Sequence, residues 1–372
     1  MRVWLVVLTA ASVGLLATSM TTVPAKSKGI QSILERYLEQ EGLPGGVLLV
    51  SSPDRREVTV AGLADIDRGS PVGPDTRFYV ASVGKMAVAV AVLQQVEEGL
   101  LSLEAPVMPL LGGVPEAHRL ANIRTAKLGQ LLDHSSGIPD YLTDEFTVAF
   151  HARPRRLTPA AVLPFAFGLR AAGRSGASYD YSNSNFVLLG DIVATADGVP
   201  FDQALQRRVL HRAGMRDTSI GADPQGRGLA HGYADLDDSG TAEDVSRFAW
   251  NSPLGDGPLV TTAADLERFL FALFRDGKLL QPATLARMSA ASINEEGYGL
   301  GVERGRDRWG AWFGHSGSDD GFEAEARYYP GRRTALVVMV NGNSVSEDSI
   351  LDAAATALFG GRPVGKRTEI HR

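Results

Sequence analysis

The 372-residue sequence contains no cysteine, which excludes disulfide bonds, cysteine-based zinc sites, iron–sulfur clusters and thiol nucleophiles. The sequence also has no excess of positive charge, because it contains 37 Lys and Arg and 43 Asp and Glu, which gives a formal net charge of −6. This balance argues against nucleic acid as a partner, since nucleic-acid binders normally concentrate basic residues in a patch. The sequence also lacks the HExxH metalloprotease pattern, the phosphate-binding glycine loop and the GxSxG nucleophile elbow. No metal and no cofactor are therefore expected.

A long apolar run occurs only at the N-terminus. Arg2 precedes an apolar stretch over residues 3–16, and small and polar residues follow up to Val23-Pro24-Ala25. This layout is typical of a secretory signal peptide and is short for a membrane span. We therefore expect residues 1–25 to be a signal peptide, and the protein to be exported to the periplasm or the cell exterior. After cleavage it would keep no stable membrane span. An uncleaved membrane anchor is the alternative.

The first third of the chain reads as a helix, a hairpin and a second helix. Apolar residues recur at helical spacing over residues 30–41, and Gly42 and Pro44 end that helix. Residues 45–52 and 56–64 read as two strands of a hairpin. Residues 86–93 are all apolar, which predicts a helix that is buried on every side and ends at Gly99.

The remainder predicts a helical middle followed by strands. Residues 100–210 are mainly helical in pattern, and a capping box at Thr262–Asp265 opens another helix that runs to about residue 275. Strand candidates follow at 297–304, 309–317, 322–330 and 334–343, and a closing helix is expected at 346–359. The order predicts an α+β fold, with an antiparallel sheet built from both chain ends and a mainly helical lobe inserted between them. We expect one catalytic domain over residues 26–372, with an α/β lobe at about 26–85 and 211–372 and a helical lobe at about 86–210.

Ser82 and Lys85 stand three residues apart at the start of the apolar helix, so their side chains are expected on one face. Free N–H groups at a helix start can stabilise an oxyanion, which suits a nucleophilic serine. A lysine in apolar surroundings is poorly hydrated as an ammonium, which favours the neutral amine as a base. The alternative is a helix-capping serine followed by a lysine that reaches solvent. The pair alone does not decide, because S-x-x-K is expected about once by chance in a chain of this length.

Two further short patterns occur once each. Tyr181 and Asn183 form Y-x-N, and His315 and Gly317 form H-x-G. Separately, each has an ordinary interpretation: a turn with a packed tyrosine, and a strand-edge histidine followed by a turn glycine. Together with the serine–lysine pair they form an ordered set spread over more than two hundred residues.

This ordered set resembles the serine β-lactamase and penicillin-binding protein family. The similar branch holds class C β-lactamases, D-alanyl-D-alanine carboxypeptidases, D-amino-acid peptidases and related esterases. Longer segments strengthen the resemblance, and they are FYVASVGK, LLDHSSGIPDY (131–141), GPLVTTAADLERF (257–269) and YGLG (298–301). The resemblance covers nearly all of the chain after residue 25. It implies an antiparallel sheet flanked by helices, as in the β-lactamase/transpeptidase fold.

The resemblance also implies catalytic roles. Ser82 would attack a carbonyl and form an acyl-enzyme, and Lys85 and Tyr181 would share the proton transfers. Asn183 would bind a substrate amide or orient Lys85. The backbone N–H groups of Ser82 and Ser318 would form the oxyanion hole.

Other residues of the matched segments receive supporting roles. His315 would line the site and contact a substrate carboxylate or tune the electrostatics, and Gly317 would shape the strand beside which substrate lies. His134 lies in the best-matched segment, and we interpret it as a structural residue that holds its loop by hydrogen bonds.

One departure from the pattern bears on the substrate. Class C β-lactamases carry K-T-G where this chain has H-S-G, so a fixed lysine cation is missing. The sequence therefore predicts an exported serine hydrolase acting on a small-molecule or peptide substrate, a small ester or a D-amino-acid amide. D-alanyl-D-alanine carboxypeptidase-like and esterase activities stay open. The alternatives are a weak class C-like β-lactamase and a non-catalytic protein that binds penicillin or cell-wall peptide.

Overall fold

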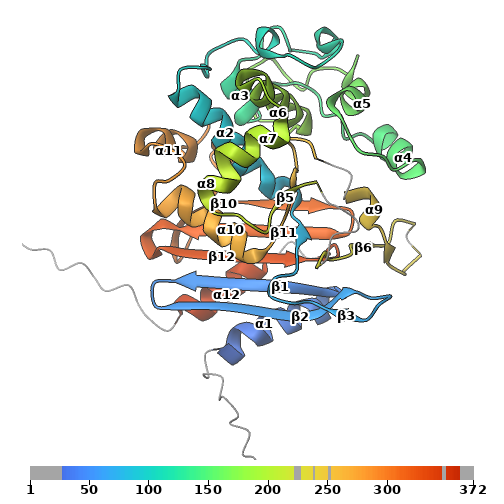
Figure 1. Ribbon diagram of the computed structural model, residues 1–372, viewed down its shortest axis with the longest axis vertical. Coiled ribbons are helices and arrows are strands. Elements are labelled where there is room, and N and C mark those ends of the chain that lie inside the picture. Colours follow the sequence, from blue (N-terminus) through green and yellow to red (C-terminus); the bar gives the residue numbers. More distant parts are fainter. Residues whose placement is uncertain (1–26, 222–227, 238, 250–252, 346–348, 361–372) are drawn as a thin grey trace, which may run out of the picture.

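The computed structural model describes residues 27–221, 228–237, 239–249, 253–345 and 349–360. The central feature is an antiparallel sheet with strand order β3-β2-β1-β12-β11-β10-β9 (Figure 1). Its strands are β1 (Gly45–Ser52), β2 (Arg55–Asp65), β3 (Ser70–Pro71), β9 (Glu303–Asp307), β10 (Gly310–Asp319), β11 (Phe322–Tyr329) and β12 (Thr334–Val340). The two chain ends meet where β1 pairs with β12, with Val47 opposite Met339. The predicted α+β class, with a sheet shared by both ends of the chain, is confirmed.

Helices cover both faces of the sheet (Figure 1). On one face lie α1 (Ser27–Glu41) and α12 (Ile350–Phe359). The other side carries α2 (Lys85–Glu97), α3 (Leu128–Leu132), α4 (Asp144–Ala152), α5 (Pro159–Val162), α6 (Asn183–Asp197), α7 (Phe201–Leu205), α8 (His211–Ala213), α9 (Ser246–Ala249), α10 (Ala263–Leu270) and α11 (Pro282–Ser289). Smaller pairings join β4 (Phe78–Tyr79), β8 (Leu259–Thr261) and β5 (Ser219–Ile220), and β6 (Tyr233–Ala234) with β7 (Glu243–Asp244). The lobe boundaries expected at residues 85 and 211 stay a prediction.

Alternation along the central strands explains why both faces are covered. In β1, Val47 and Leu49 belong to the core on the α2 side, whereas Leu48 and Val50 belong to the core under α1 and α12. Successive side chains of a strand point to opposite faces, so an uninterrupted apolar strand needs a packed layer on each side. Strand β12 follows the same rule.

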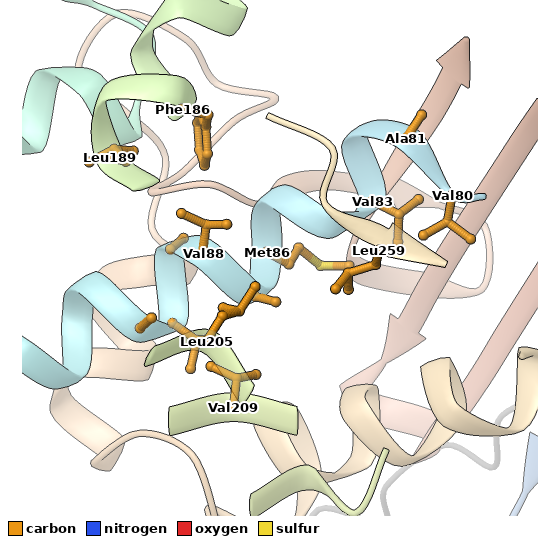
Figure 2. Packing of buried hydrophobic residues seen from close by; sticks show 14 of the residues in the cluster. Val80, Ala81, Val83, Met86, Val88, Phe186, Leu189, Leu205, Val209 and Leu259 are labelled. Carbon is orange, nitrogen blue, oxygen red and sulfur yellow. The ribbon is translucent and has the colours of Figure 1, made fainter. Parts of the chain in front are cut away.

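Helix α2 is the centre of the larger core. Residues 85–95 of this helix are all buried, as the all-apolar pattern predicts. Its side chains pack against Phe186 of α6, against Leu205 and Val209, and against Leu259 of β8 (Figure 2). Burying an aliphatic side chain of this size contributes roughly 1.5–3 kcal/mol, so α2 is held in place by packing. The turn that precedes it is fixed as a consequence.

Two predicted elements need correction. The strand expected at 297–304 starts only at Glu303, because the preceding backbone bonds elsewhere: the N–H of Leu300 donates to the carbonyl of Met288. The helix opened by Thr262 does reach Arg275 as predicted, as an α-helix to Leu270 and then as one π-helical turn. The closing helix begins at Ile350 after a Ser349 cap, and residues 346–348 lie outside the described part of the chain.

The predicted signal peptide, residues 1–25, also lies outside the described residues. Within the described part of the chain, no helix combines the length and the apolar character that a membrane span requires.

Candidate active site

The turn that carries Ser82 is a short 3₁₀ helix, η1, over Ala81–Gly84, and α2 follows it from Lys85. The sequence placed Ser82 in the first turn of one continuous helix, so this is a local correction. Side chains at i and i+3 eclipse one another in a 3₁₀ turn. Lys85 Nζ accordingly lies 2.7 Å from Ser82 Oγ. Ser82 makes no capping hydrogen bond to either helix, which removes the ordinary explanation for this serine.

The backbone before Ser82 is strained. Ala81 has a φ of 42°, a value that L-residues with a Cβ seldom adopt. Strain of this kind costs of order 1–3 kcal/mol and gathers at functional sites. Gly84 lets the turn pack closely, because a Cβ there would lie 2.7 Å from Cδ of Pro258.

Lys85 is fully buried, and three oxygen atoms surround its amine. Nζ donates to Ser82 Oγ, to Asn183 Oδ1 at 2.8 Å and to the Asp256 carbonyl at 2.6 Å. Three acceptors match the three N–H bonds of an ammonium, so the geometry holds the amine in one position beside the serine. Asn183 is in turn anchored, because its Nδ2 donates to Asp140 Oδ2 at 2.9 Å. Orientation of Lys85 is therefore the role of Asn183 that the geometry supports.

Tyr181 completes the polar centre from the loop before α6. Its hydroxyl lies 3.0 Å from Ser82 Oγ, so the serine oxygen contacts both Lys85 and Tyr181. His134 stacks on the Tyr181 ring with a centroid separation of 4.1 Å. Its Nδ1 accepts a hydrogen bond from the backbone N–H of Ser182 at 3.1 Å. Burial, and then the charge of Lys85, lower the pKa of His134 well below its usual range, so the ring is neutral. His134 thus positions the tyrosine loop, as the sequence interpretation expects.

Strand β10 forms the opposite wall, and Gly317 lets it approach the Ser82 turn. A Cβ on Gly317 would lie 2.5 Å from the carbonyl oxygen of Val80 and 2.8 Å from the backbone nitrogen of Ser82. Real Cβ atoms do not tolerate such distances to backbone atoms, so the close contact requires glycine. Ser318 follows and lines the same cavity as Ser82. The strand edge and the Ser82 backbone are therefore adjacent, as the predicted oxyanion hole requires.

His315 shares the Gly317 face of β10 but is not among the described residues that line this cavity. It is 1 % exposed, its Nε2 is 2.9 Å from the hydroxyl of Tyr298, and its Nδ1 is 2.5 Å from the carbonyl oxygen of Ser316. Because a carbonyl can only accept, Nδ1 carries the proton and Nε2 accepts from the tyrosine. Burial lowers the pKa of His315, against the neighbouring Glu303, so the neutral ring is favoured. Direct contact with a substrate does not fit this placement, and a neutral ring offers no charge to a substrate carboxylate.

A cavity of about 430 Å³ opens onto Ser82, within the size range of small-molecule sites. Its described lining consists of Tyr79, Ala81, Ser82, Tyr141, Leu142, Phe146, Thr147, Phe150, His151, Leu157, Tyr181, Asn183, Phe248, Asp256, Gly257, Ser318, Asp319, Asp320 and Asn343. The predicted residues Ser82, Tyr181, Asn183 and Ser318 therefore meet in one cavity, with Lys85 directly behind Ser82.

Several lining residues were missed by the sequence reasoning. Asp256 supplies a carbonyl to Lys85, and its carboxylate accepts from the hydroxyl of Tyr141 at 2.6 Å. His151 and Asp320 meet across 169 residues of chain with Nε2 and Oδ2 2.6 Å apart. Two signals were available, because Tyr141 ends one matched segment and Asp256 immediately precedes another. Nothing in the sequence indicates the pairing of His151 with Asp320.

The site defines a serine hydrolase that works by acyl transfer, because an accessible serine is surrounded by a buried lysine, a tyrosine and a strand edge. A sequence model of the family described as Beta-lactamase matches residues 30–360. The chain belongs to the β-lactamase family.

Two curated proteins illustrate the similarity. Penicillin-binding protein 4* of Bacillus subtilis (strain 168) is 25 % identical over 358 residues, covering 90 % of this chain and 76 % of the relative. The putative penicillin-binding protein PbpX of the same organism is 28 % identical over 275 residues, covering 72 % of this chain and 64 % of the relative.

Solved structures share the fold. A D-stereospecific amidohydrolase from a Streptomyces species has a TM-score of 0.77 and 26 % identity, covering 90 % of this chain and 99 % of that one. A D-amino acid amidase from Ochrobactrum anthropi SV3, complexed with L-phenylalanine amide, has a TM-score of 0.76 and 23 % identity, covering 91 % and 99 %. The structural likeness supports the α+β fold with its antiparallel sheet.

Proposed function

We propose that the protein cleaves D-amino-acid amides or small esters through an acyl-enzyme on Ser82. The observation that carries this proposal is the position of Ser82 Oγ, 2.7 Å from Lys85 Nζ and 3.0 Å from the Tyr181 hydroxyl. These are hydrogen-bond distances, so either group can receive the serine proton once it has itself lost a proton. A protein that only bound penicillin or peptide would need neither group at that distance.

The reaction follows from these contacts. Ser82 Oγ forms a bond to the substrate carbonyl carbon while its proton passes to the Tyr181–Lys85 pair. The carbonyl oxygen becomes an oxyanion beside the backbone N–H groups of Ser82 and Ser318. Collapse breaks the bond to the leaving amine or alcohol, which takes up the proton. Water then attacks the acyl-enzyme, the acid is released and Ser82 recovers its proton. Both half-reactions use the same pair, first as base and then as acid.

Two observations favour an amide or ester over the alternatives. His315 is buried and neutral, and no Lys or Arg lines the described part of the cavity, so no side-chain cation there matches the carboxylate of a β-lactam or of D-alanyl-D-alanine. The solved D-stereospecific amidohydrolase, which shares the fold at 26 % identity, adds support for an amide substrate.

The test combines turnover with active-site labelling. Wild type and Ser82→Ala are incubated with D-phenylalanine p-nitroanilide, p-nitrophenyl acetate, a D-Ala-D-Ala peptide and a chromogenic cephalosporin. Wild type should turn over the anilide or the ester, and a fluorophosphonate should add one mass adduct on Ser82. Ser82→Ala should show neither. No turnover together with no adduct on wild type would overturn the proposal.

Export is a second part of the proposal and rests on residues 1–25 alone. Expression with this segment should deliver the protein outside the cytoplasm with a new N-terminus at residue 26. N-terminal sequencing checks this, and an intact Met1 on cell-associated protein would contradict it.

A further inference from the structure

The cavity in front of Ser82 has a one-sided charge. Asp256, Asp319 and Asp320 line it, and no Lys or Arg does so among the described residues. His151 is the one lining residue of that part of the chain that can carry a positive charge, and its Nε2 already contacts Asp320 Oδ2 at 2.6 Å. Lys85 is fully buried behind Ser82 and bonds to three oxygens of the protein. The lining therefore keeps an uncompensated negative charge.

Asp256 shows that this charge lacks a partner within the protein. The residue is only 7 % exposed, and its Oδ2 accepts from the hydroxyl of Tyr141. Its Oδ1 has no hydrogen-bond partner among the described residues. A buried carboxylate oxygen without a donor is costly, and burial raises the pKa of this carboxyl even though the charge of Lys85 opposes the rise. A donor from a ligand in the cavity would remove that cost.

Of the three aspartates in the lining, Asp319 is the one that is adjacent in sequence to the predicted oxyanion hole. It ends β10 directly after Ser318, the residue expected to bind the oxyanion, and its side chain is exposed in the cavity. Its carboxylate accepts hydrogen bonds from the hydroxyl of Tyr79 and from the backbone N–H of Asp320, and no cationic side chain pairs with it in the described part of the structure. The side chain is open to the cavity but enclosed by its walls, and this burial, followed by the charge of the neighbouring Asp320, raises the pKa of Asp319 to about 6. A cation bound next to this carboxylate would stabilise its charged form, because the opposite charge offsets the cost of burial and the repulsion from Asp320.

The lining of the cavity also contains a cluster of aromatic rings. Phe146 and Phe150 of α4 stack with centroids 5.5 Å apart, and Phe248 of α9 lies against Phe150 at 5.9 Å. These rings give an apolar group a surface to pack on. A ligand that matches this lining carries both an apolar side chain and a positive charge.

We propose that the cavity selects acyl donors with a free primary ammonium group next to the scissile carbonyl, and that Asp319 is the specificity-determining residue that binds this group. The inference rests on the proposed function, because it names the substrate class of the same Ser82 site. Asp256 and Asp320 add to the negative potential, and the aromatic cluster takes the side chain of the amino acid. The substrate class is thus an unblocked amino-acid amide or ester, as distinct from an N-acylated peptide.

The first experiment compares two substrates that differ by one charge. D-phenylalanine p-nitroanilide carries the ammonium, and 3-phenylpropanoyl p-nitroanilide has hydrogen in its place. Wild type should prefer the charged substrate in kcat/KM, and Asp319→Asn should reduce that preference roughly tenfold, since charge-assisted hydrogen bonds are about twice as strong as neutral ones. Asp202→Asn, the same change on the exposed surface of α7, should leave the ratio unaltered. Equal turnover of both substrates by wild type, or an unchanged ratio in Asp319→Asn, would overturn the inference.

The pH dependence gives a second readout. Asp319 is charged above a pH of about 6 and neutral below it, so the preference for the ammonium substrate should fall as the pH decreases through this value. The groups that face Asp319 are Asp320, Asp256 and Tyr79, and His151 contacts Asp320. In Asp319→Asn the ratio should lose this pH dependence. A wild-type ratio that stays flat between pH 5 and 7 would contradict the assignment to Asp319.

A binding measurement separates this inference from the proposed function. Ser82→Ala is titrated calorimetrically with D-phenylalaninol, which carries an ammonium, and with the neutral 3-phenyl-1-propanol. The ammonium compound should bind more tightly, and the added change Asp319→Asn should remove most of the difference. Equal affinity for the two alcohols overturns the inference even if the wild type is a hydrolase. Preferential binding in a protein with no turnover and no Ser82 adduct would uphold it while the proposed function fails.

Discussion

Gly317→Ala should disable the site while leaving the fold intact. The added Cβ would meet the carbonyl oxygen of Val80 at 2.5 Å, and the backbone nitrogens of Ser82 and Val83 at 2.8 and 3.0 Å. All three atoms belong to the backbone of the Ser82 turn, so no side-chain rotation relieves the overlap. Comfortable separations are about 3.5–4.0 Å, so β10 and the turn must move apart by roughly 1 Å.

We expect this displacement of β10 to reduce the rate of catalysis more than the stability of the fold. Misplacement by about 1 Å can cost roughly 100-fold in rate, and loss of one oxyanion donor about 2.7–4 kcal/mol. We therefore expect kcat for p-nitrophenyl acetate to fall by about 10²–10³. Overpacking of this kind costs typically 1–3 kcal/mol of stability, so the variant should still fold.

The assay pairs steady-state kinetics with thermal unfolding. Gly331→Ala is the matched control, because a Cβ at Gly331 meets nothing within 4 Å. It should keep wild-type kcat. If Gly317→Ala retains kcat within threefold of wild type, close contact between β10 and the Ser82 turn is not needed for catalysis and the oxyanion reasoning is refuted.

Two further predictions concern the proton pair and the stability of the core. Tyr181→Phe removes the hydroxyl 3.0 Å from Ser82 Oγ, so the rate of acylation, measured as the pre-steady-state burst, should fall by about 10²–10⁴ while the melting temperature changes little. Arg208→Met strips the buried carboxylate of Asp197 of its main partner and should cost about 3–5 kcal/mol in urea unfolding. Burial alone would raise the pKa of Asp197, but hydrogen bonds from Arg208 lower it to about 2. The pair's stabilisation is therefore fully present above about pH 4 and is lost as the pH falls through 2, so a variant whose acid unfolding matches wild type would refute this role.

The sheet and its central helix were predictable because burial leaves a periodic trace. The apolar strands 45–52 and 334–340, and the all-apolar run 86–93, show their environments directly in the sequence. The strand wrongly predicted at 297–304 shows where this periodic trace misleads. Residues there are apolar because they pack on the helical side, and their backbone bonds to Met288 and Leu132 rather than to a sheet neighbour. Periodicity reports burial and does not report which backbone group is the partner.

The catalytic residues were predictable by type, and their surroundings were not. Ser82 and Lys85 are three residues apart, so local geometry alone brings them together. The contacts from Lys85 to Asn183 and to the Asp256 carbonyl cross 98 and 171 residues of chain, and only the tertiary fold creates them. His315 illustrates the same limit, because its pattern matches a substrate-lining residue while its burial against Tyr298 keeps it out of the cavity lining.

The charges around Ser82 form one consistent argument about the substrate. Where a lysine would offer a fixed positive charge, His315 is neutral and buried, so a substrate carboxylate finds no cationic side chain in the described cavity. Asp256 and Asp319 add negative charge to the lining of the cavity, which repels a carboxylate and attracts an ammonium. The histidine at position 315 in place of a lysine and the aspartates of the cavity are separate in sequence, yet both disfavour a substrate carboxylate. A site that had merely lost carboxylate binding would need only the loss of the lysine. The additional aspartates therefore favour selection for a positively charged substrate.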